Sequence, residues 1–300
     1  MTAYAISRFL TSLVLAVALP LAANAALDTN RIEQLTGLKG TWSATEGVFK
    51  VTAPRNDVKV AVDGWTMPPF MGLASWAAFT ESSMGAVMVM GDTVVFQDEV
   101  NPVMSAALDN GLSVTALHNH FFYDEPKVYF MHIGGEGSAA KLATAVRKVW
   151  DKIKEIRAAN PQPTIAFGST PLPAQSSITG KTIEDILGVK GQASNGMFKV
   201  VIGRSTQMMD TKVGKEMGVN TWAAFAGTDD NAVVDGDFAV LEAELQPVLK
   251  NLRTSGVNIV AIHSHMTHEK PRILFLHYWG RGQVEELAKA VKSALDTQSK

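Results

Sequence analysis

Apolar and polar positions follow two different periods along this chain. Residues 112–122 and 128–133 are rich in β-branched and aromatic side chains and flank the turn-forming sequence Tyr-Asp-Glu-Pro-Lys, which predicts a β-hairpin. Residues 138–153 instead place apolar side chains at helical spacing after a serine, and residues 283–295 repeat that pattern. The chain therefore mixes hairpin-connected strands with amphipathic helices.

The same order of elements occurs twice: a short helix, three or four strands, a helix, a hairpin and a closing helix. In the first copy, Asp28 or Thr29 can cap the first helix and Gly37 can end it, while a helix from about Asp98 stops at Gly111. Hairpin-connected strands with helices gathered elsewhere are typical of an α+β unit. We therefore predict two tandem α+β units, each an antiparallel sheet with helices packed on it, related by a pseudo-twofold axis.

Sequence similarity between the two halves extends over most of the chain. Residues 31–40 match residues 182–191, and residues 71–79 match residues 217–225. This is a duplication of a whole domain and not a short solenoid repeat. Four prolines between the copies are typical of a stiff, extended linker. The predicted boundaries are a signal peptide over 1–25, repeat 1 over 26–157, a linker over 158–178 and repeat 2 over 179–300.

The N-terminus resembles a secretory signal. Arg8 precedes an apolar run over residues 9–22, which is followed by the small residues Ala23, Asn24 and Ala25. This pattern is typical of a signal peptide that is cleaved near Ala25. Because later apolar runs are too short to span a bilayer, we expect an exported, periplasmic protein without a membrane anchor.

Composition narrows the possible partners. The formal charge is only −2 and no basic patch stands out, so we expect no nucleic acid and no membrane surface as partner. The chain has no cysteine, which removes disulfides and thiolate ligands. A small molecule or a metal ion is the expected ligand, and protein partners are left open.

All seven histidines lie in two segments, residues 116–132 and 261–277, which align without a gap. The spacing His-x-His-x11-His is kept in both. A duplicated triplet favours two copies of one site. The candidate metal ligands are His118, His120 and His132 in repeat 1, and His263, His265 and His277 in repeat 2, with His268 as an additional candidate.

The hairpin pattern predicts how these rings meet. If each hairpin is symmetric about its turn, His118 lies opposite His132, and His120 lies opposite Phe130, with all three rings on one strand face. Three imidazoles can hold a tetrahedral ion and leave a fourth position free. Zinc is the expected divalent transition metal, although copper, iron, nickel and manganese also suit histidine. The alternative is a polar histidine patch without metal.

Other residues recur in both repeats. Glu99 and Glu244 precede the histidine strands and are candidates for a fourth ligand or a general base, with a helix-start role as the alternative. His268 stands where repeat 1 has Tyr123 and could add a ligand to the second site. We expect tight turns for Asp92 and Asp237 and core packing for Trp76 and Trp222. For Arg55 and Arg204 we expect surface ion pairs, with binding of a substrate carboxylate or phosphate as the alternative.

The repeated histidine motif, with its preceding acidic residue and proline and its intervening acidic turn, resembles the LppY/LpqO-like family of exported bacterial proteins. The resemblance covers nearly all of the chain after residue 25. It implies an exported two-repeat protein and supplies no reaction. Family members with a lipid anchor carry a lipobox cysteine, which this chain lacks.

These patterns leave three functions open. The first is a periplasmic protein that binds divalent transition metal through its duplicated histidine hairpins. The second is a metal-dependent hydrolase that uses a metal-bound water, with Glu99 or Glu244 assisting. The third is an interaction module in which the histidines form a polar patch. The sequence does not decide whether the protein is an enzyme.

Overall fold

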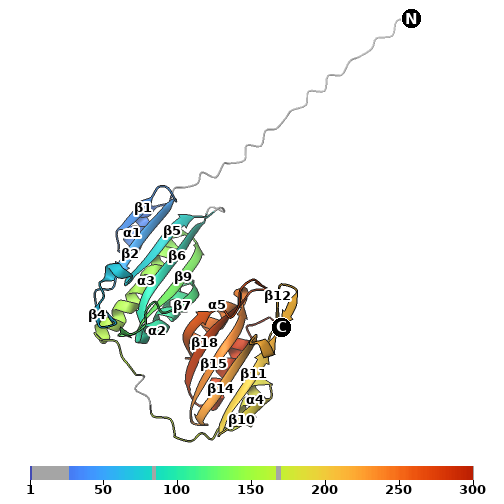
Figure 1. Ribbon diagram of the computed structural model, residues 1–300. Helices are drawn as coiled ribbons and strands as arrows, with labels where there is room; N and C mark the ends of the chain where they lie inside the picture. Colours follow the sequence, from blue (N-terminus) through green and yellow to red (C-terminus); the bar gives the residue numbers. More distant parts are fainter. Residues whose placement is uncertain (2–26, 83–85, 167–169, 300) are drawn as a thin grey trace.

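The computed structural model describes residues 1, 27–82, 86–166 and 170–299 (Figure 1). The predicted signal peptide falls, apart from Met1, outside these residues. Among the described residues, no helix is both long and apolar enough to cross a membrane.

Each repeat contains the predicted order of helices and long strands, with additional short strands and a 3-10 turn between them. Repeat 1 comprises α1 (Thr29–Thr36), β1 (Gly40–Ser43), β2 (Val48–Pro54), β3 (Ala61–Val62), β4 (Trp65–Thr66), η1 (Pro69–Met71), β5 (Ala74–Glu81), β6 (Val87–Phe96), α2 (Gln97–Asp109), β7 (Ser113–His118), β8 (Asp124–Glu125), β9 (Val128–Gly137) and α3 (Ala139–Ala159). Repeat 2 comprises α4 (Gly180–Leu187), β10 (Gly191–Ser194), β11 (Met197–Gly203), β12 (Thr206–Met208), β13 (Thr211–Val213), η2 (Lys215–Met217), β14 (Asn220–Thr228), β15 (Asn231–Leu241), α5 (Glu242–Thr254), β16 (Asn258–His263), β17 (Glu269–Lys270), β18 (Ile273–Gly282) and α6 (Val284–Leu295).

The residues predicted to cap and end the helices do so in the structure. The side chain of Asp28 accepts a hydrogen bond of 2.9 Å from the backbone N–H of Arg31, and Gly37 ends α1 with φ 72°. Ser138 caps α3 in the same way through the N–H of Lys141. The prediction of helix α2 from about Asp98 is confirmed within one residue.

The strands of both repeats form one antiparallel sheet of twelve strands, in the order β1-β2-β5-β6-β9-β7-β16-β18-β15-β14-β11-β10. The order of repeat 2 is that of repeat 1 reversed, and the two halves meet where Leu117 of β7 pairs with Ile262 of β16. These two residues occupy equivalent positions in the duplicated sequence. The α+β prediction with antiparallel sheets is therefore confirmed.

Reciprocal hydrogen bonds cross the junction between the repeats. The amide of Asn101 in α2 donates to the carbonyl of Ile259 and accepts from its N–H, at 3.1 and 2.7 Å. The amide of Gln246 in α5 does the same with Val114, at 2.8 Å for both bonds. Asn101 and Gln246 are equivalent residues, and so are Val114 and Ile259. Each repeat thus uses a helix side chain to hydrogen-bond backbone N–H and C=O groups in the edge strand of the other repeat.

The two faces of the sheet differ in their covering. The α-helices of the described residues, α1 to α6, pack against one face, and a continuous apolar core extends beneath them through both repeats. On the opposite face, called the open face below, the small sheets β4-β3-β8 and β13-β12-β17 cover only part of each repeat. Because side chains alternate along a strand, every second residue of the central strands points to this open face.

The two repeated tryptophans lie on the open face, so the prediction that they fill the cores is wrong. Their neighbours, Ala77 in β5 and Ala223 in β14, face the core instead and are buried. The ammonium of Lys50 lies 4.4 Å from the ring centre of Trp76, and Lys199 lies 4.1 Å from that of Trp222. Both repeats therefore present a lysine–tryptophan pair on the open face.

The repeated arginines form ion pairs that are buried in repeat 1 and partly buried in repeat 2, not the expected surface pairs. Arg55 donates two hydrogen bonds to Glu99, at 2.8 and 2.9 Å, and Arg157 Nε lies 2.9 Å from the same carboxylate. The side chain of Glu99 is 0% exposed. In repeat 2, burial raises the pKa of Glu244, but hydrogen bonds from Arg204, from the Ser299 side chain and from backbone N–H groups together outweigh it and lower the pKa to about 2.

Replacing Glu99 by Gln should destabilise the protein by about 3 to 5 kcal/mol, because two buried guanidinium groups would lose their shared charge partner. The free energy of unfolding in urea measures this effect. Glu155→Gln is the matched control, since Glu155 forms an exposed pair with Lys152 and its loss should cost under ~1 kcal/mol. Equal losses for the two variants would contradict the buried ion-pair account.

Candidate metal centre

The histidine hairpins form, but with a register different from the predicted one. His118 lies opposite Phe130, and His132 lies opposite Ala116, with an irregularity next to Val114. The pairing is shifted by two residues because the connection between β7 and β9 is not symmetric about Glu125. A shift of two residues keeps every side chain on its face. The predicted facing pairs are wrong, whereas the shared face of His118 and His132 is confirmed.

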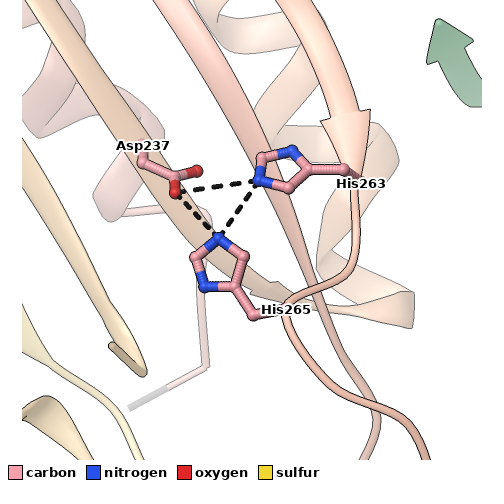
Figure 2. A group of neighbouring side chains, drawn as sticks. All are labelled: Asp237, His263 and His265. Carbon is pink, nitrogen blue, oxygen red and sulfur yellow. Dashed lines mark hydrogen bonds and ion pairs between the residues drawn. The ribbon is translucent and has the colours of Figure 1, made fainter. Parts of the chain in front are cut away.

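In repeat 2, three side chains bring their donor atoms together on the open face (Figure 2). The Nε2 atoms of His263 and His265 are 3.1 Å apart, and Nε2 of His265 lies 3.3 Å from Oδ2 of Asp237. Nε2 of His263 lies 4.0 Å from the same oxygen. Asp237 comes from β15, His263 from the end of β16, and His265 from the segment that follows. We call these three residues the Asp–His–His group.

His277 borders this group. Its ring stacks on that of His263, with the ring centres 4.7 Å apart and the planes at 15°. Its Nδ1 atom lies 3.4 Å from the carbonyl oxygen of Gly236, a contact that orients the ring. His277 also lies directly opposite Asp237 on the neighbouring strand. The structure thus gathers all three predicted histidines of repeat 2 around one carboxylate.

Repeat 1 gathers the equivalent rings at similar separations. The ring centres of His118 and His120 are 5.1 Å apart, and those of His118 and His132 are 5.2 Å apart. His120 stacks on Phe130 at 3.3 Å, just as His265 of repeat 2 stacks on its own phenylalanine at 3.5 Å. This aromatic backing holds each ring although it lies beyond the end of its strand.

The aspartates of both groups were missed by the sequence reading, which placed them in tight turns. Asp92 lies in the middle of β6 opposite His132, and Asp237 lies in the middle of β15. Their side chains are buried, and the Oδ1 atom of each has no hydrogen-bond partner among the described residues. The sequence did contain a signal for these aspartates. Each is an acidic residue inside an apolar strand, and it recurs at the same place in both halves.

The local electrostatics favour the neutral form of His263 in repeat 2. Burial, followed by the neighbouring His277 and His265, lowers the pKa of His263 to about 4. Burial raises the pKa of Asp237, against the opposing effect of the histidines. Burial likewise lowers the pKa of His120 in repeat 1. A neutral imidazole is the form that binds a metal ion.

The structure does not bring the remaining candidates to these groups. Both carboxylate oxygens of Glu99 are bonded to arginines, and one also accepts the N–H of Phe96 at the start of α2. Glu244 is held in the same way by Arg204. His268 is exposed at a left-handed turn position with φ 67°, and no contact joins it to the group among the described residues. The helix-start alternative therefore describes the two glutamates.

The chemistry of the group suits a divalent cation. One carboxylate oxygen and two imidazole nitrogens are a common ligand set for zinc and for other transition metals that keep an open position. The side chains of His263 and His265 are 30% and 34% exposed, so one side of the group faces solvent. An ion at this place would be accessible to a further ligand.

Comparison with known proteins gives a family and no activity. No curated protein matches the chain. A solved structure, that of the trimeric bacterial microcompartment shell protein PduB, is 11% identical over 86% of this chain and 89% of that one, with a TM-score of 0.21, and supports no argument here. The resemblance to the LppY/LpqO-like proteins stays a prediction.

A family described as Domain of Unknown Function (DUF1259) matches the chain twice, over residues 30–152 and 181–297. The two matches coincide with the two structural repeats and confirm the internal duplication. Because together they span most of the chain, this protein belongs to that family and carries two copies of its domain.

Proposed function

We propose that this is an exported protein that binds one divalent transition-metal ion in each repeat, with zinc as the expected ion. The sequence pattern at residues 8–25 supports export, and the two duplicated groups support metal binding. The proposed ligands of repeat 2 are Asp237, His263 and His265, with His277 alongside. Those of repeat 1 follow from their equivalent positions in the duplicated sequence: Asp92, His118 and His120, with His132 alongside.

The observation that carries this proposal is the buried, unpartnered carboxylate oxygen of Asp92 and Asp237. A buried carboxylate without a cation or sufficient hydrogen bonds is costly, and proteins tolerate such a group where it serves a purpose. Imidazoles in the neutral form that binds metal add donor nitrogens but no positive charge. A bound divalent cation would supply that charge. Asp92 of repeat 1 has an unpartnered oxygen in the same way, and Asp237 of repeat 2 also has two imidazole nitrogens within 4.0 Å.

The other two functions have less support. The hydrolase needs a general base near the ion, and the two glutamates considered for that role lie in buried ion pairs instead. A histidine patch without metal would leave Oδ1 of Asp237 without a partner, and burial disfavours the positive charge on His263 that could otherwise compensate the carboxylate. Metal binding, for storage, delivery or ligand capture, therefore accounts best for the group.

We also propose that a pseudo-twofold axis relates the two repeats at the β7–β16 junction. The pairing of the equivalent residues Leu117 and Ile262 supports it, because a twofold axis brings equivalent residues together. The reciprocal contacts of Asn101 and Gln246 support it as well. The two metal sites would then be symmetric copies on one open face.

The protein purified without an affinity tag and stripped of metal should bind two equivalents of Zn²⁺, one for each repeat. Calorimetric titration gives the count, and the double variant Asp92→Asn/Asp237→Asn provides the matched background. Binding of a single equivalent would show that one group is inactive or that both share an ion. Equal binding by the protein and the double variant would remove the proposal.

Asp237→Asn should abolish one of the two equivalents by weakening that site at least ~100-fold, because the only anionic ligand is lost. The same variant should unfold at a higher temperature than the parent when both are metal-free at pH 7. A buried carboxyl with a raised pKa contributes stability below that pKa and loses it as the pH rises, so the neutral amide removes a penalty.

Asp235→Asn is the control for this variant, because Asp235 lies two residues away on the same face and is exposed. It should keep both metal equivalents. If Asp237→Asn retained two equivalents at unchanged affinity, Asp237 would not be a ligand.

A further inference from the structure

Beside each proposed metal-binding group, the open face carries a tryptophan on the strand next to the aspartate. Trp76 lies opposite Asp92, which in turn lies opposite His132. Trp222 lies opposite Asp237 in the same way. Directly opposed residues have their Cβ atoms about 5 Å apart. Each indole therefore borders the carboxylate that we propose as a metal ligand, and it is only partly buried.

A lysine accompanies each tryptophan. Lys50 and Lys199 place their ammonium groups 4.4 and 4.1 Å from the indole centres. Among the described residues, neither lysine forms an ion pair with a carboxylate, although many other lysines of the chain do. Both repeats thus keep a flat apolar surface and a free positive charge next to the Asp–His–His group or its equivalent.

The charge balance of a loaded site favours an anion. A divalent cation held by one carboxylate and neutral imidazoles leaves a net charge of about +1, and a metal with three protein ligands accepts a further one. The neighbouring ammonium adds to this positive potential. The indole face can cover the planar, apolar body of the same ligand.

We propose that each loaded site captures a small organic carboxylate, whose oxygen binds the metal while the tryptophan and lysine hold the rest of the molecule. This inference rests on the proposed metal binding and names the class of ligand. It explains why both repeats place a large aromatic side chain on the open face, where burial does not require it.

The repeats differ in charge at a position beside this site. Repeat 1 has Met90 two residues before Asp92, where repeat 2 has Asp235 before Asp237. Residues two apart on a strand face are about 7 Å from one another, within the range of charge interactions at physiological salt. Charged residues further along the strands, Glu136 and Arg281, lie two positions farther away from the metal ligands. Asp235 should therefore repel a carboxylate, and the site of repeat 1 should bind it more tightly.

The experiment uses Co²⁺ as the metal, because its visible absorption bands respond to a new ligand. Asp237→Asn leaves only the site of repeat 1, and Asp92→Asn leaves only that of repeat 2. Each Co²⁺-loaded protein is titrated with acetate and with phenylacetate. We expect both anions to shift the bands, phenylacetate to bind more tightly than acetate, and repeat 1 to bind about fivefold more tightly than repeat 2.

Single substitutions in the repeat 1 protein test each contact. Trp76→Leu should remove the preference for phenylacetate over acetate. Lys50→Gln and Met90→Asp should each weaken both anions about fivefold, the scale expected for one exposed charge. Lys148→Gln, on the helix-covered side of the sheet, is the matched control and should change neither affinity.

The outcomes separate the two proposals. Absence of Co²⁺ bands in both single-site proteins would overturn metal binding itself, and the ligand inference with it. Bands that form but do not respond to either anion would overturn only the ligand inference. Equal affinities for both anions, unchanged by Trp76→Leu and Lys50→Gln, would overturn the role of the tryptophan and the lysine.

Discussion

The alternation of side chains along hydrogen-bonded strands determines what each face of this protein does. Residues of one parity fill the core beneath helices α1 to α6, and residues of the other parity carry the carboxylates, imidazoles and indoles of the open face. Asp92 and Asp237 follow this alternation, and each places a buried carboxylate in the middle of a strand. One oxygen of each carboxylate has no partner, which costs folding free energy. A bound metal ion would offset this cost, which is why we propose metal binding as the function.

Much of the fold could be predicted because it depends on local signals. Helix caps, turn residues and the two-residue alternation of strands predicted the helices and strands. Sequence similarity between the two halves predicted the duplication. The predicted strand register was wrong by two residues, but the histidines still lie close together. A shift of two residues keeps His118 and His132 on the same face. The joining of both repeats into one sheet was not predicted, since it depends on the contact between β7 and β16.

The missed residues share a physical reason: their roles depend on neighbours far away in the sequence. Asp92 follows a glycine and resembles a turn residue until its strand is paired on both sides. Trp76 resembles a core residue until the parity of β5 is known, and Glu99 resembles a free carboxylate until Arg55 and Arg157 reach it. Spacing along the chain determines which side chains share a face, whereas the order of strands determines which of them meet.

Anomalous X-ray scattering from crystals grown with Zn²⁺ tests the central claim most directly. The account predicts two peaks at the zinc edge, one in each repeat, about 2.0 to 2.2 Å from a carboxylate oxygen of Asp92 or Asp237 and from imidazole nitrogens of the same repeat. Well-ordered crystals without a peak at either aspartate, or with zinc bound only at exposed histidines such as His268, would contradict it.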